Sequence, residues 1–525
     1  MAKTDSRSRV AMWDRMPRRP CGEPIELPRA VLLIDTERAL EEVGQPLDRA
    51  VFTRAVRVFH QPHKIEHTRR RQDRVAAGRG PCNGCETVQP VVSFWAEART
   101  LVFGTHRRVK EASNQTSKDT RARMNPMESS QSLHLARRMR ALEPSATLAM
   151  AARASAMAAA GIKVVDLSVG EPDFPTPPHI CQAAETAIRA GKTKYTPAAG
   201  IPELRKAVAA DYTRRTGLAV TPAQVVVSNG AKHSLHNAFT SLLNEGDEVI
   251  VPTPYWVSYA ELIKLAGAKP VLLSTRIEDD FKLKPDALRA AITPATRMLL
   301  LCTPSNPTGV VYSADELRAL ADIAIEADLA VVSDEIYDQL VFDGQRAVSF
   351  PTLRPGLEAR TVVVAGVSKT YSMTGWRIGW TICPEPLAKA IGNLQSQETS
   401  NPCSVSQHAA VAALSGPQEC VAEMCRAFQK RRDLVAGRLS ALPGVRLPRI
   451  GGAFYAFFDI QPALSAGKNG ITTSTQWCEA LLEQEQVALV AGSAFGAEGH
   501  VRMSFAASDE KLNEGLDRIA RFLGT

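Results

Sequence analysis

The sequence lacks any long run of apolar residues, which argues against a membrane-spanning protein. Its apolar stretches, such as Met298–Cys302, are far shorter than the roughly 20 residues that a helix needs to cross a bilayer. Hydrophobic residues make up 45% and charged residues 22% of the 525 residues, proportions typical of soluble globular proteins. A wholly disordered chain and a small disulfide-stapled module are therefore excluded, and the length allows about two to four domains.

The ten cysteines lack regular spacing. Three lie in the first quarter of the chain and seven in the rest, and the chain begins without the pattern of a secretory signal. We therefore expect reduced thiols in a cytoplasmic protein. Cys82 and Cys85, with His60, His63 and His67 upstream, are of the types that bind zinc, but a closed zinc site usually has two tight ligand pairs. We expect no metal site.

The positive charge is confined to the N-terminal quarter. The net charge is +8, yet residues 1–126 hold 24 Lys and Arg against 15 Asp and Glu, so the rest is slightly acidic. These basic residues are mixed with acidic ones and follow no helix-turn-helix or aromatic pattern, so no nucleic-acid partner is expected. The segment also lacks periodicity. We expect a basic extension that is disordered or, because Met127 offers an alternative start, not part of the native product.

Beyond about residue 140, short β-branched runs alternate with amphipathic stretches of helical length, which is typical of a βαβ sheet. The runs are continuously apolar, which indicates strands buried on both faces of a largely parallel sheet. Helices are expected over 203–216, after Pro202, and over 315–327, after the capping box of Ser313 and Glu316. The expected strands are Val225–Ser228, Glu248–Val251, Pro270–Leu273, Met298–Cys302, Ala330–Ser333, Thr361–Ala365 and Ile378–Ile382.

The last hundred residues change character and predict a smaller α+β domain. An Ala-rich helix expected over Ser145–Ala160 would complete this domain from the N-terminal side. We therefore expect the extension 1–126, a first part of the small domain over 127–174, a large domain over 175–410, and the second part of the small domain over 411–525. The elements expected near the C-terminus are helices over 421–439 and 509–523 and strands over 453–459 and 501–504.

Polar residues follow three of the seven expected strands. In open α/β sheets, ligands bind beyond the carboxyl ends of the strands, so these residues are candidates for a site. Asn306 follows the fourth expected strand, Asp334 and Tyr337 follow the fifth, and Lys369 follows the sixth. Taken singly, each is also explained as an ordinary turn, capping or solvated residue.

Together and in this order, these residues resemble the class I/II aminotransferases, which depend on pyridoxal phosphate. The resemblance covers about residues 130–523, and within the family the chain is most similar to bacterial-type aspartate and aspartate/prephenate aminotransferases. It implies the pyridoxal-phosphate aminotransferase fold, an α/β fold with a mostly parallel seven-stranded sheet in the large domain and a smaller α+β domain. The motifs are Gly170-Glu171-Pro172-Asp173-Phe174, Lys194-Tyr195, Asn229-Gly230-Ala231-Lys232, Pro254-Tyr255-Trp256-Val257-Ser258-Tyr259, Asn306-Pro307-Thr308-Gly309, Asp334-Glu335-Ile336-Tyr337, Ser368-Lys369-Thr370, Ser372-Met373-Thr374-Gly375-Trp376-Arg377-Ile378-Gly379, Gly452-Ala453-Phe454-Tyr455 and Val501-Arg502.

The resemblance implies roles for four residues around the cofactor ring. Lys369 is the catalytic residue, which binds the cofactor aldehyde and later carries a proton between the substrate α-carbon and the cofactor C4′ atom. Asp334 keeps the pyridine nitrogen protonated, as the cofactor's electron sink requires. Tyr337 and Asn306 hydrogen-bond the phenolic oxygen of the cofactor.

The resemblance also implies a phosphate site and a homodimer. Arg377 supplies fixed positive charge, and a turn that contains Ala231 and Lys232 supplies donors at the start of a helix. The Ser368 hydroxyl lies beside the lysine in sequence and is a further candidate for the phosphate. In the family a tyrosine of the neighbouring subunit reaches the phosphate, and Tyr195 matches it, so a homodimer with shared active sites is expected.

The resemblance implies that Arg502 binds the α-carboxylate of the substrate. A guanidinium matches a carboxylate with two parallel hydrogen bonds, which explains the residue type. Gly170 and Asn306 are expected to contribute to the same substrate site. Trp256 is expected to stack on the cofactor or line the substrate pocket, with a structural core tryptophan as the alternative.

In the same branch of the family, a Lys after Asn-Gly and a Thr of a Pro-Ser-Ala-Thr segment hold the distal carboxylate. Lys232 and Thr147 match these positions. The expected reaction is transamination between L-aspartate or L-glutamate and 2-oxoglutarate or oxaloacetate, with prephenate as a further acceptor. Alanine or aromatic substrates, a lyase of the same fold and a cofactor-binding transcriptional regulator are the alternatives. The paired dicarboxylate residues favour transamination.

Overall fold

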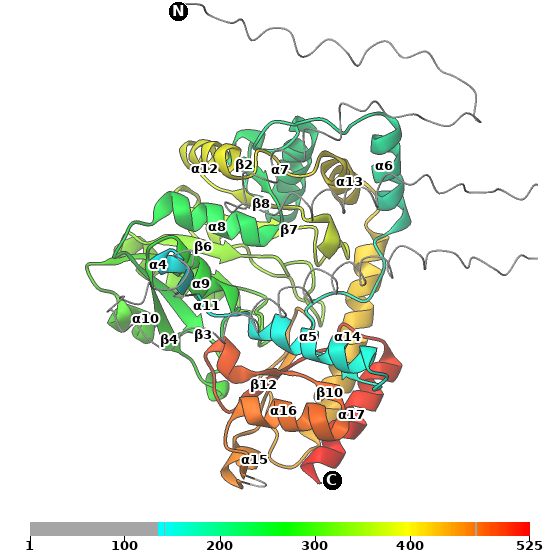
Figure 1. Cartoon of the computed structure of the whole chain (residues 1–525). Coiled ribbons are helices and arrows are strands. Elements are labelled where there is room, and N and C mark those ends of the chain that lie inside the picture. Colours follow the sequence, from blue (N-terminus) through cyan, green and yellow to red (C-terminus); the bar gives the residue numbers. More distant parts are fainter. Residues whose placement is uncertain (1–134, 141, 468–469, 525) are drawn as a thin grey trace, which may run out of the picture. The chain divides into compact units, whose positions relative to one another are not determined.

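A computed structural model of the chain describes residues 135–140, 142–467 and 470–524 (Figure 1). The predicted extension 1–126, with its alternative start at Met127 and its cysteine and histidine cluster, lies outside the described residues. None of the helices in the described ranges combines the length and apolarity that crossing a bilayer requires.

A seven-stranded sheet forms the centre of the larger α/β part, and the predicted fold class is confirmed. The strand order is β2-β8-β7-β6-β5-β3-β4, and six strands are parallel while β8 runs antiparallel to both of its neighbours. All seven predicted strands are present, with ends shifted by at most two residues. The strands are β2 (Val225–Ser228), β3 (Glu248–Thr253), β4 (Lys269–Ser274), β5 (Thr296–Cys302), β6 (Ala330–Asp334), β7 (Thr361–Gly366) and β8 (Gly379–Ile382).

Helices cover both faces of this sheet because its strands are apolar on both sides. On one face, α6, α7, α11 and α13 pack on residues such as Val227, Leu299 and Val363. On the other face, α8, α9 and α12 pack on the alternate residues, such as Val226 and Val362. The helices are α6 (Pro178–Arg189), α7 (Pro202–Thr216), α8 (Ala231–Leu242), α9 (Ser258–Leu265), α10 (Pro285–Ala291), α11 (Ala314–Glu326), α12 (Glu385–Glu398) and α13 (Ser404–Ser415).

The sequence signals at the helix ends explain two of these elements. Pro202 is the first residue of α7, where its missing N–H costs nothing. The Ser313 hydroxyl accepts from the Glu316 amide at 3.3 Å, and the Glu316 carboxylate accepts from the Ser313 amide at 2.7 Å. The predicted capping box at the start of α11 is therefore confirmed.

Two small sheets and four larger helices form a second assembly of elements. β1 pairs in parallel with β10, and β11, β12 and β9 form an antiparallel sheet in that order. The predicted helix over 509–523 matches α17. The elements are α4 (Arg137–Arg140), α5 (Ala146–Ala159), β1 (Val165–Asp166), α14 (Glu419–Ser440), β9 (Tyr455–Asp459), α15 (Gln461–Ser465), α16 (Ser474–Glu485), β10 (Val487–Ala488), β11 (Val490–Ala491), β12 (His500–Ser504) and α17 (Asp509–Leu523).

The N-terminal elements pack against the C-terminal ones, as the sequence led us to expect. Leu167 belongs to the same buried cluster as Phe458 and Leu512. Ala154 of α5 packs with Leu482 and Ala488, and Figure 1 shows α5, in cyan, beside the orange and red elements. The domain boundaries at 174/175 and 410/411 stay predictions.

Gly379 fixes the close approach between β8 and the start of α8. A Cβ atom at this position would lie 2.3 Å from the Ala231 amide nitrogen and 2.6 Å from the Gly230 carbonyl carbon. Both atoms belong to the backbone, so no side-chain rotation relieves the overlap. A larger residue at 379 must therefore displace the first turn of α8.

We predict that Gly379→Ala lowers the free energy of unfolding by about 1–3 kcal/mol, because of this overpacking. Urea unfolding of the two proteins measures the change. Gly437→Ala is the matched control, since Gly437 lies within α14 and an added Cβ meets nothing within 4 Å. That variant is expected to gain up to about 1 kcal/mol from helix propensity. A Gly379→Ala protein as stable as the wild type contradicts this account of the packing.

Candidate active site

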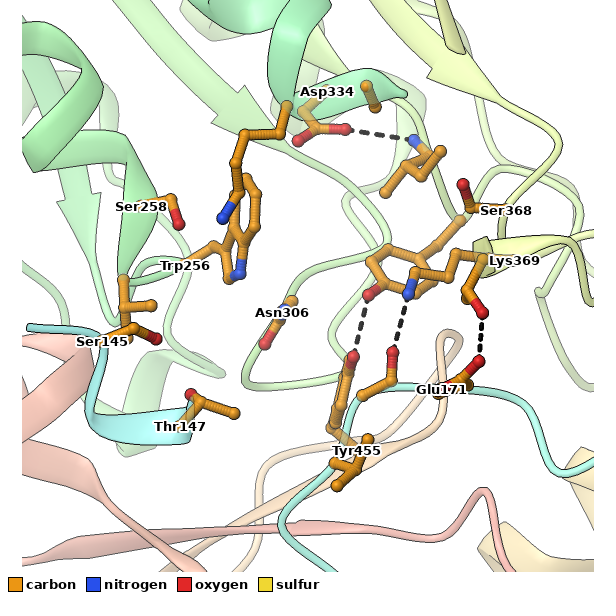
Figure 2. Close-up of a pocket in the computed structure, with 18 of the residues that line it drawn as sticks. Ser145, Thr147, Glu171, Trp256, Ser258, Asn306, Asp334, Ser368, Lys369 and Tyr455 are labelled. Carbon is orange, nitrogen blue, oxygen red and sulfur yellow. Dashed lines mark hydrogen bonds between the residues drawn. The ribbon is translucent and has the colours of Figure 1, made fainter. Parts of the chain in front are cut away.

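A cavity of about 350 Å³ lies at the carboxyl edge of the large sheet, where the ends of β5, β6 and β7 meet α5, α8 and β12 (Figure 2). Every predicted site residue except Tyr195 lines it. Tyr195 is 90% exposed and lies outside this lining. The predicted residues in the lining are Thr147, Gly170, Ala231, Lys232, Trp256, Asn306, Asp334, Tyr337, Ser368, Lys369, Arg377 and Arg502.

Lys369 projects into the cavity from the loop that follows β7. Its Nζ atom donates a hydrogen bond to the Gly170 carbonyl at 2.6 Å. Burial lowers the pKa of Lys369 to about 8, although Glu171 acts in the opposite direction. The amine is therefore far more often neutral, and nucleophilic, than an exposed lysine at neutral pH.

Asp334 is the last residue of β6 and its side chain is 3% exposed. One carboxylate oxygen accepts from the Tyr259 hydroxyl at 2.6 Å, and the other accepts from the Ile336 amide at 3.2 Å. Burial raises the pKa of Asp334 to about 6, while these hydrogen bonds and Lys369 lower it. The carboxyl group is therefore mostly ionised at neutral pH despite its burial.

The adjacent acid, Glu335, does not belong to the site. Its carboxylate accepts from the Ser333 and Ser349 hydroxyls, each at 2.8 Å, and from the Phe350 amide at 3.2 Å. Those partners lie outside the cavity lining. Two neighbouring carboxylates on one strand end thus face different environments, and Asp334 alone of the pair reaches the cavity.

Tyr337 is linked to a tyrosine that the sequence motifs contained but to which no role was given. The hydroxyls of Tyr337 and Tyr455 lie 2.9 Å apart. A Cβ atom on Gly170 would lie 2.4 Å from the Tyr455 hydroxyl, so this approach requires glycine at position 170. Tyr455 therefore packs directly against Gly170, whose carbonyl accepts from Lys369.

Arg502 lies on β12 and is 2% exposed. Its Nη1 atom donates to the Asn306 side-chain oxygen at 3.1 Å, and its Nη2 atom donates to the Ser168 carbonyl at 2.6 Å. Its Nε atom has no hydrogen-bond partner among the described residues. The guanidinium also lies over the rings of Tyr455 and Phe495, at 4.6 and 4.9 Å. A buried cation with an unused donor suits an anionic ligand.

A second cationic region lies at the start of α8. The Arg377 guanidinium approaches Gly230 so closely that a Cβ atom there would lie 2.4 Å from its Nη2 atom. Gly230 has a φ of 85° and precedes Ala231, the first residue of α8. The amide end of this helix and Arg377 therefore face the same space, which favours a doubly charged anion such as a phosphate.

Lys232 and Trp256 lie against each other in the lining of the cavity. The Lys232 Nζ atom lies 4.9 Å from the centre of the Trp256 ring. Partial burial and the nearby Arg377 both lower the pKa of Lys232. Figure 2 shows Ser145, Thr147, Ser258 and Trp256 on the side of the cavity away from Lys369.

Twelve of the lining residues were not predicted as site residues, and four of these bear on the geometry of the site. Ser145 caps α5, Ser258 begins α9, Tyr259 pairs with Asp334, and Tyr455 pairs with Tyr337. All four lie inside motifs already recognised in the sequence, so these motifs were a usable signal. Among the described residues, no group of three or more His, Cys, Asp or Glu side chains is arranged to hold a metal ion.

The comparisons with known proteins agree on one family. Residues 162–519 match the family described as aminotransferase class I and II. The chain is 46% identical to an aspartate aminotransferase of Geobacillus stearothermophilus over 370 residues, which cover 70% of this chain and 94% of that protein. It is 48% identical over 373 residues to an aspartate/prephenate aminotransferase of Cereibacter sphaeroides, covering 70% of this chain and 93% of that protein.

Solved structures give the same result at the level of the fold. The structure of an aspartate aminotransferase from Thermus thermophilus with maleate aligns with a TM-score of 0.71 and 42% identity, over 74% of this chain and all of that one. An aspartate aminotransferase from Rhizobium meliloti aligns with a TM-score of 0.70 and 44% identity, over 75% of this chain and 99% of that one. With the family match spanning more than half of the sequence, these likenesses show that the chain belongs to the class I and II aminotransferases.

Proposed function

We propose that the protein uses pyridoxal phosphate to transfer the amino group of L-aspartate or L-glutamate to a 2-oxo acid. The observation that carries this proposal is a buried amine whose pKa is lowered to about 8, Lys369, and a buried carboxylate, Asp334, in one cavity with two separate cationic regions. The α-carboxylate of an amino acid and a cofactor phosphate are both anionic, so two cationic regions suit two such groups.

The lining residues fit this cofactor. When bound, pyridoxal phosphate supplies an aldehyde for the amine and an electron-withdrawing ring. Asp334 would face the ring nitrogen. Arg377, Ser368 and the backbone amides of Ala231 and Lys232 would hold the phosphate. Asn306 and Tyr337 line the same cavity as Lys369. Charge complementarity at both ends of the cavity supports this orientation.

Lys369 would do the chemical work of proton transfer. Its amine is held against the Gly170 carbonyl at 2.6 Å, and a flexible four-carbon stem lets it swing from that position. After substrate enters, the freed amine would take the proton from the substrate α-carbon as a general base and would deliver it, as a general acid, to the C4′ atom of the cofactor. A pKa of about 8 suits both directions near neutral pH.

The two carboxylates of the substrate would be held by different residues. Arg502 would bind the α-carboxylate, with Gly170, Asn306 and Trp256 around it. Lys232 and Thr147 lie in the same cavity and would bind the distal carboxylate. The printed names of the relatives, aspartate aminotransferase and aspartate/prephenate aminotransferase, support aspartate as donor and prephenate as a further acceptor.

We also propose a homodimer with shared active sites. The support is Tyr195, a predicted phosphate ligand whose ring is 90% exposed and outside the cavity lining. The exposed ring is accessible to a neighbouring subunit, where the family resemblance expects it to act. In the proposed assembly, Tyr195 of each subunit would reach the cavity of the other.

The proposed function predicts a reversible change in absorbance. Addition of L-aspartate to the protein loaded with pyridoxal phosphate is expected to abolish the visible band of the bound cofactor, and 2-oxoglutarate is expected to restore it. An absorbance scan of the full chain after each addition measures both half-reactions, and prephenate replaces 2-oxoglutarate in a second series.

L-Alanine and Lys369→Ala serve as controls for this scan. L-Alanine lacks the distal carboxylate and is expected to react at least about tenfold more slowly, because a missing charged contact costs about 1.4 kcal/mol or more. Lys369→Ala is expected to show no turnover. A bound band that no amino donor changes contradicts the enzyme and indicates a cofactor-binding regulator instead.

The pKa of Lys369 predicts how fast the cofactor-free protein captures pyridoxal phosphate. Only the neutral amine attacks the aldehyde, and burial lowers its pKa to about 8. The capture rate, followed by stopped-flow absorbance, is therefore expected to rise from about pH 7 and level off by about pH 9. A rate that keeps rising tenfold per pH unit to about pH 10 indicates a lysine with an ordinary pKa and contradicts the burial argument.

A further inference from the structure

A buried tyrosine lies behind the carboxylate of Asp334. Tyr259 belongs to the first turn of α9, is 2% exposed, and donates its hydroxyl proton to an Asp334 oxygen at 2.6 Å. The two residues are 75 positions apart in the sequence. We propose that Tyr259 is a positioning residue, whose hydroxyl keeps the Asp334 carboxylate charged and oriented toward the cofactor ring. This inference rests on the proposed function.

The carboxylate oxygens of Asp334 keep acceptor sites for a hydrogen-bond donor on a ligand in the cavity. Tyr259 donates to one oxygen at 2.6 Å and the Ile336 amide donates to the other at 3.2 Å. Each carboxylate oxygen can accept a second hydrogen bond. With both oxygens anchored from the protein side, the remaining acceptor sites are available to a ligand in the cavity. The shorter of the two contacts comes from Tyr259.

The tyrosine keeps its own proton. Burial raises the pKa of Tyr259 well above its ordinary value, and the nearby Asp334 raises it further. The hydroxyl is therefore a donor throughout the working pH range. A hydrogen bond donated to a carboxylate stabilises the ionised form of the acid, so the donor acts against the burial that favours the neutral form.

The other titratable groups next to Asp334 do not replace this donor. Cys302 is the neighbour of Asp334 across β5 and β6, and burial raises the pKa of its thiol to about 12, so it is neutral. Lys369 lowers the pKa of Asp334 as a cation, but less than Tyr259 does. The amine of Lys369 must also be neutral when it acts. Tyr259 is therefore the donor that persists through the reaction.

Packing holds the tyrosine ring in place. The rings of Tyr259 and Trp256 meet edge to face, with centres 5.4 Å apart and planes 86° apart. Tyr259 also belongs to the buried cluster between α8, α9 and the sheet. One short segment of the chain thus contains both Trp256, which lines the cavity, and Tyr259, which hydrogen-bonds Asp334. Tyr259→Phe removes the hydroxyl and keeps these ring contacts.

The test compares Tyr259→Phe with wild type for two ligands, pyridoxal phosphate and its 1-deaza analogue, in which carbon replaces the ring nitrogen. Without the hydroxyl, Asp334 is expected to be protonated more often and to bind the ring nitrogen less well. The Kd of pyridoxal phosphate is expected to rise about tenfold to a hundredfold, as for loss of a hydrogen bond to a charged group. The Kd of the 1-deaza analogue is expected to stay within about twofold, because its ring has no nitrogen to recognise.

Tyr212→Phe is the matched control, since it also removes a buried hydroxyl, which lies 2.6 Å from the Ser349 hydroxyl and outside the cavity. Its Kd values for both ligands are expected to equal those of the wild type. Equal weakening of both ligands by Tyr259→Phe overturns the proposal in favour of a structural role. Unchanged binding of both ligands overturns it as well.

A second readout does not depend on the proposed function. Carbon-13 NMR of cofactor-free protein with labelled aspartate carboxyls follows the titration of Asp334, assigned by the signal missing in Asp334→Asn. The pKa of Asp334 is expected to be higher in Tyr259→Phe than in wild type. An unchanged pKa overturns the inference. A raised pKa in a protein that neither binds the cofactor nor transfers amino groups supports the Tyr259 contact and rejects the proposed function alone.

Discussion

The site depends on keeping one carboxylate charged in a place where water hardly reaches it. Asp334 is 3% exposed, and burial alone raises its pKa. Under the proposed function the acid must stay ionised to attract the protonated ring nitrogen of the cofactor. Two opposite unit charges about 4 Å apart attract by about 4 kcal/mol at an effective dielectric near 20. A neutral acid loses this attraction. The Tyr259 hydroxyl, the Ile336 amide and Lys369 all favour the charged form. A more exposed acid would be ionised, but water would screen its attraction to the ring, and a buried acid without these hydrogen bonds would be neutral more often.

The topology of the sheet brings the partners of this carboxylate together. β5, β6 and β7 are adjacent and parallel, so Asn306, Asp334 and Lys369 emerge at one edge although they are spread over 64 positions. β8 then runs back, and Gly379 at its start allows α8 to begin next to Arg377. The C-terminal elements add Arg502, whose guanidinium bonds to Asn306 at 3.1 Å. Segments from both ends of the described chain thus close one cavity around residues from the sheet.

Much of this arrangement is predictable because it follows from local pattern. Continuous apolar runs identified all seven strands of the sheet, and the polar residues after three of them line the cavity. The direction of β8 was not predictable, because a continuous apolar run does not indicate whether its strand is parallel or antiparallel to its neighbours. Only the pairing in the folded sheet shows this. Tyr259 lay inside a recognised motif, but its role was missed. A tyrosine in an apolar helix face resembles a core residue, and its contact to Asp334 spans 75 positions. Tyr195 cannot be assessed within one chain, since its predicted contact lies in a neighbouring subunit.

The central claim is that Asp334 stays charged when a pyridinium ring lies against it. Nitrogen-15 NMR of the protein loaded with pyridoxal phosphate labelled at the ring nitrogen tests this directly. The account predicts the chemical shift of a protonated nitrogen from about pH 7 to about pH 9, well above the range in which a weakly basic ring nitrogen keeps its proton in water. A deprotonated ring nitrogen in the bound state across that range contradicts the account, even if the cofactor is held firmly by the residues around its phosphate.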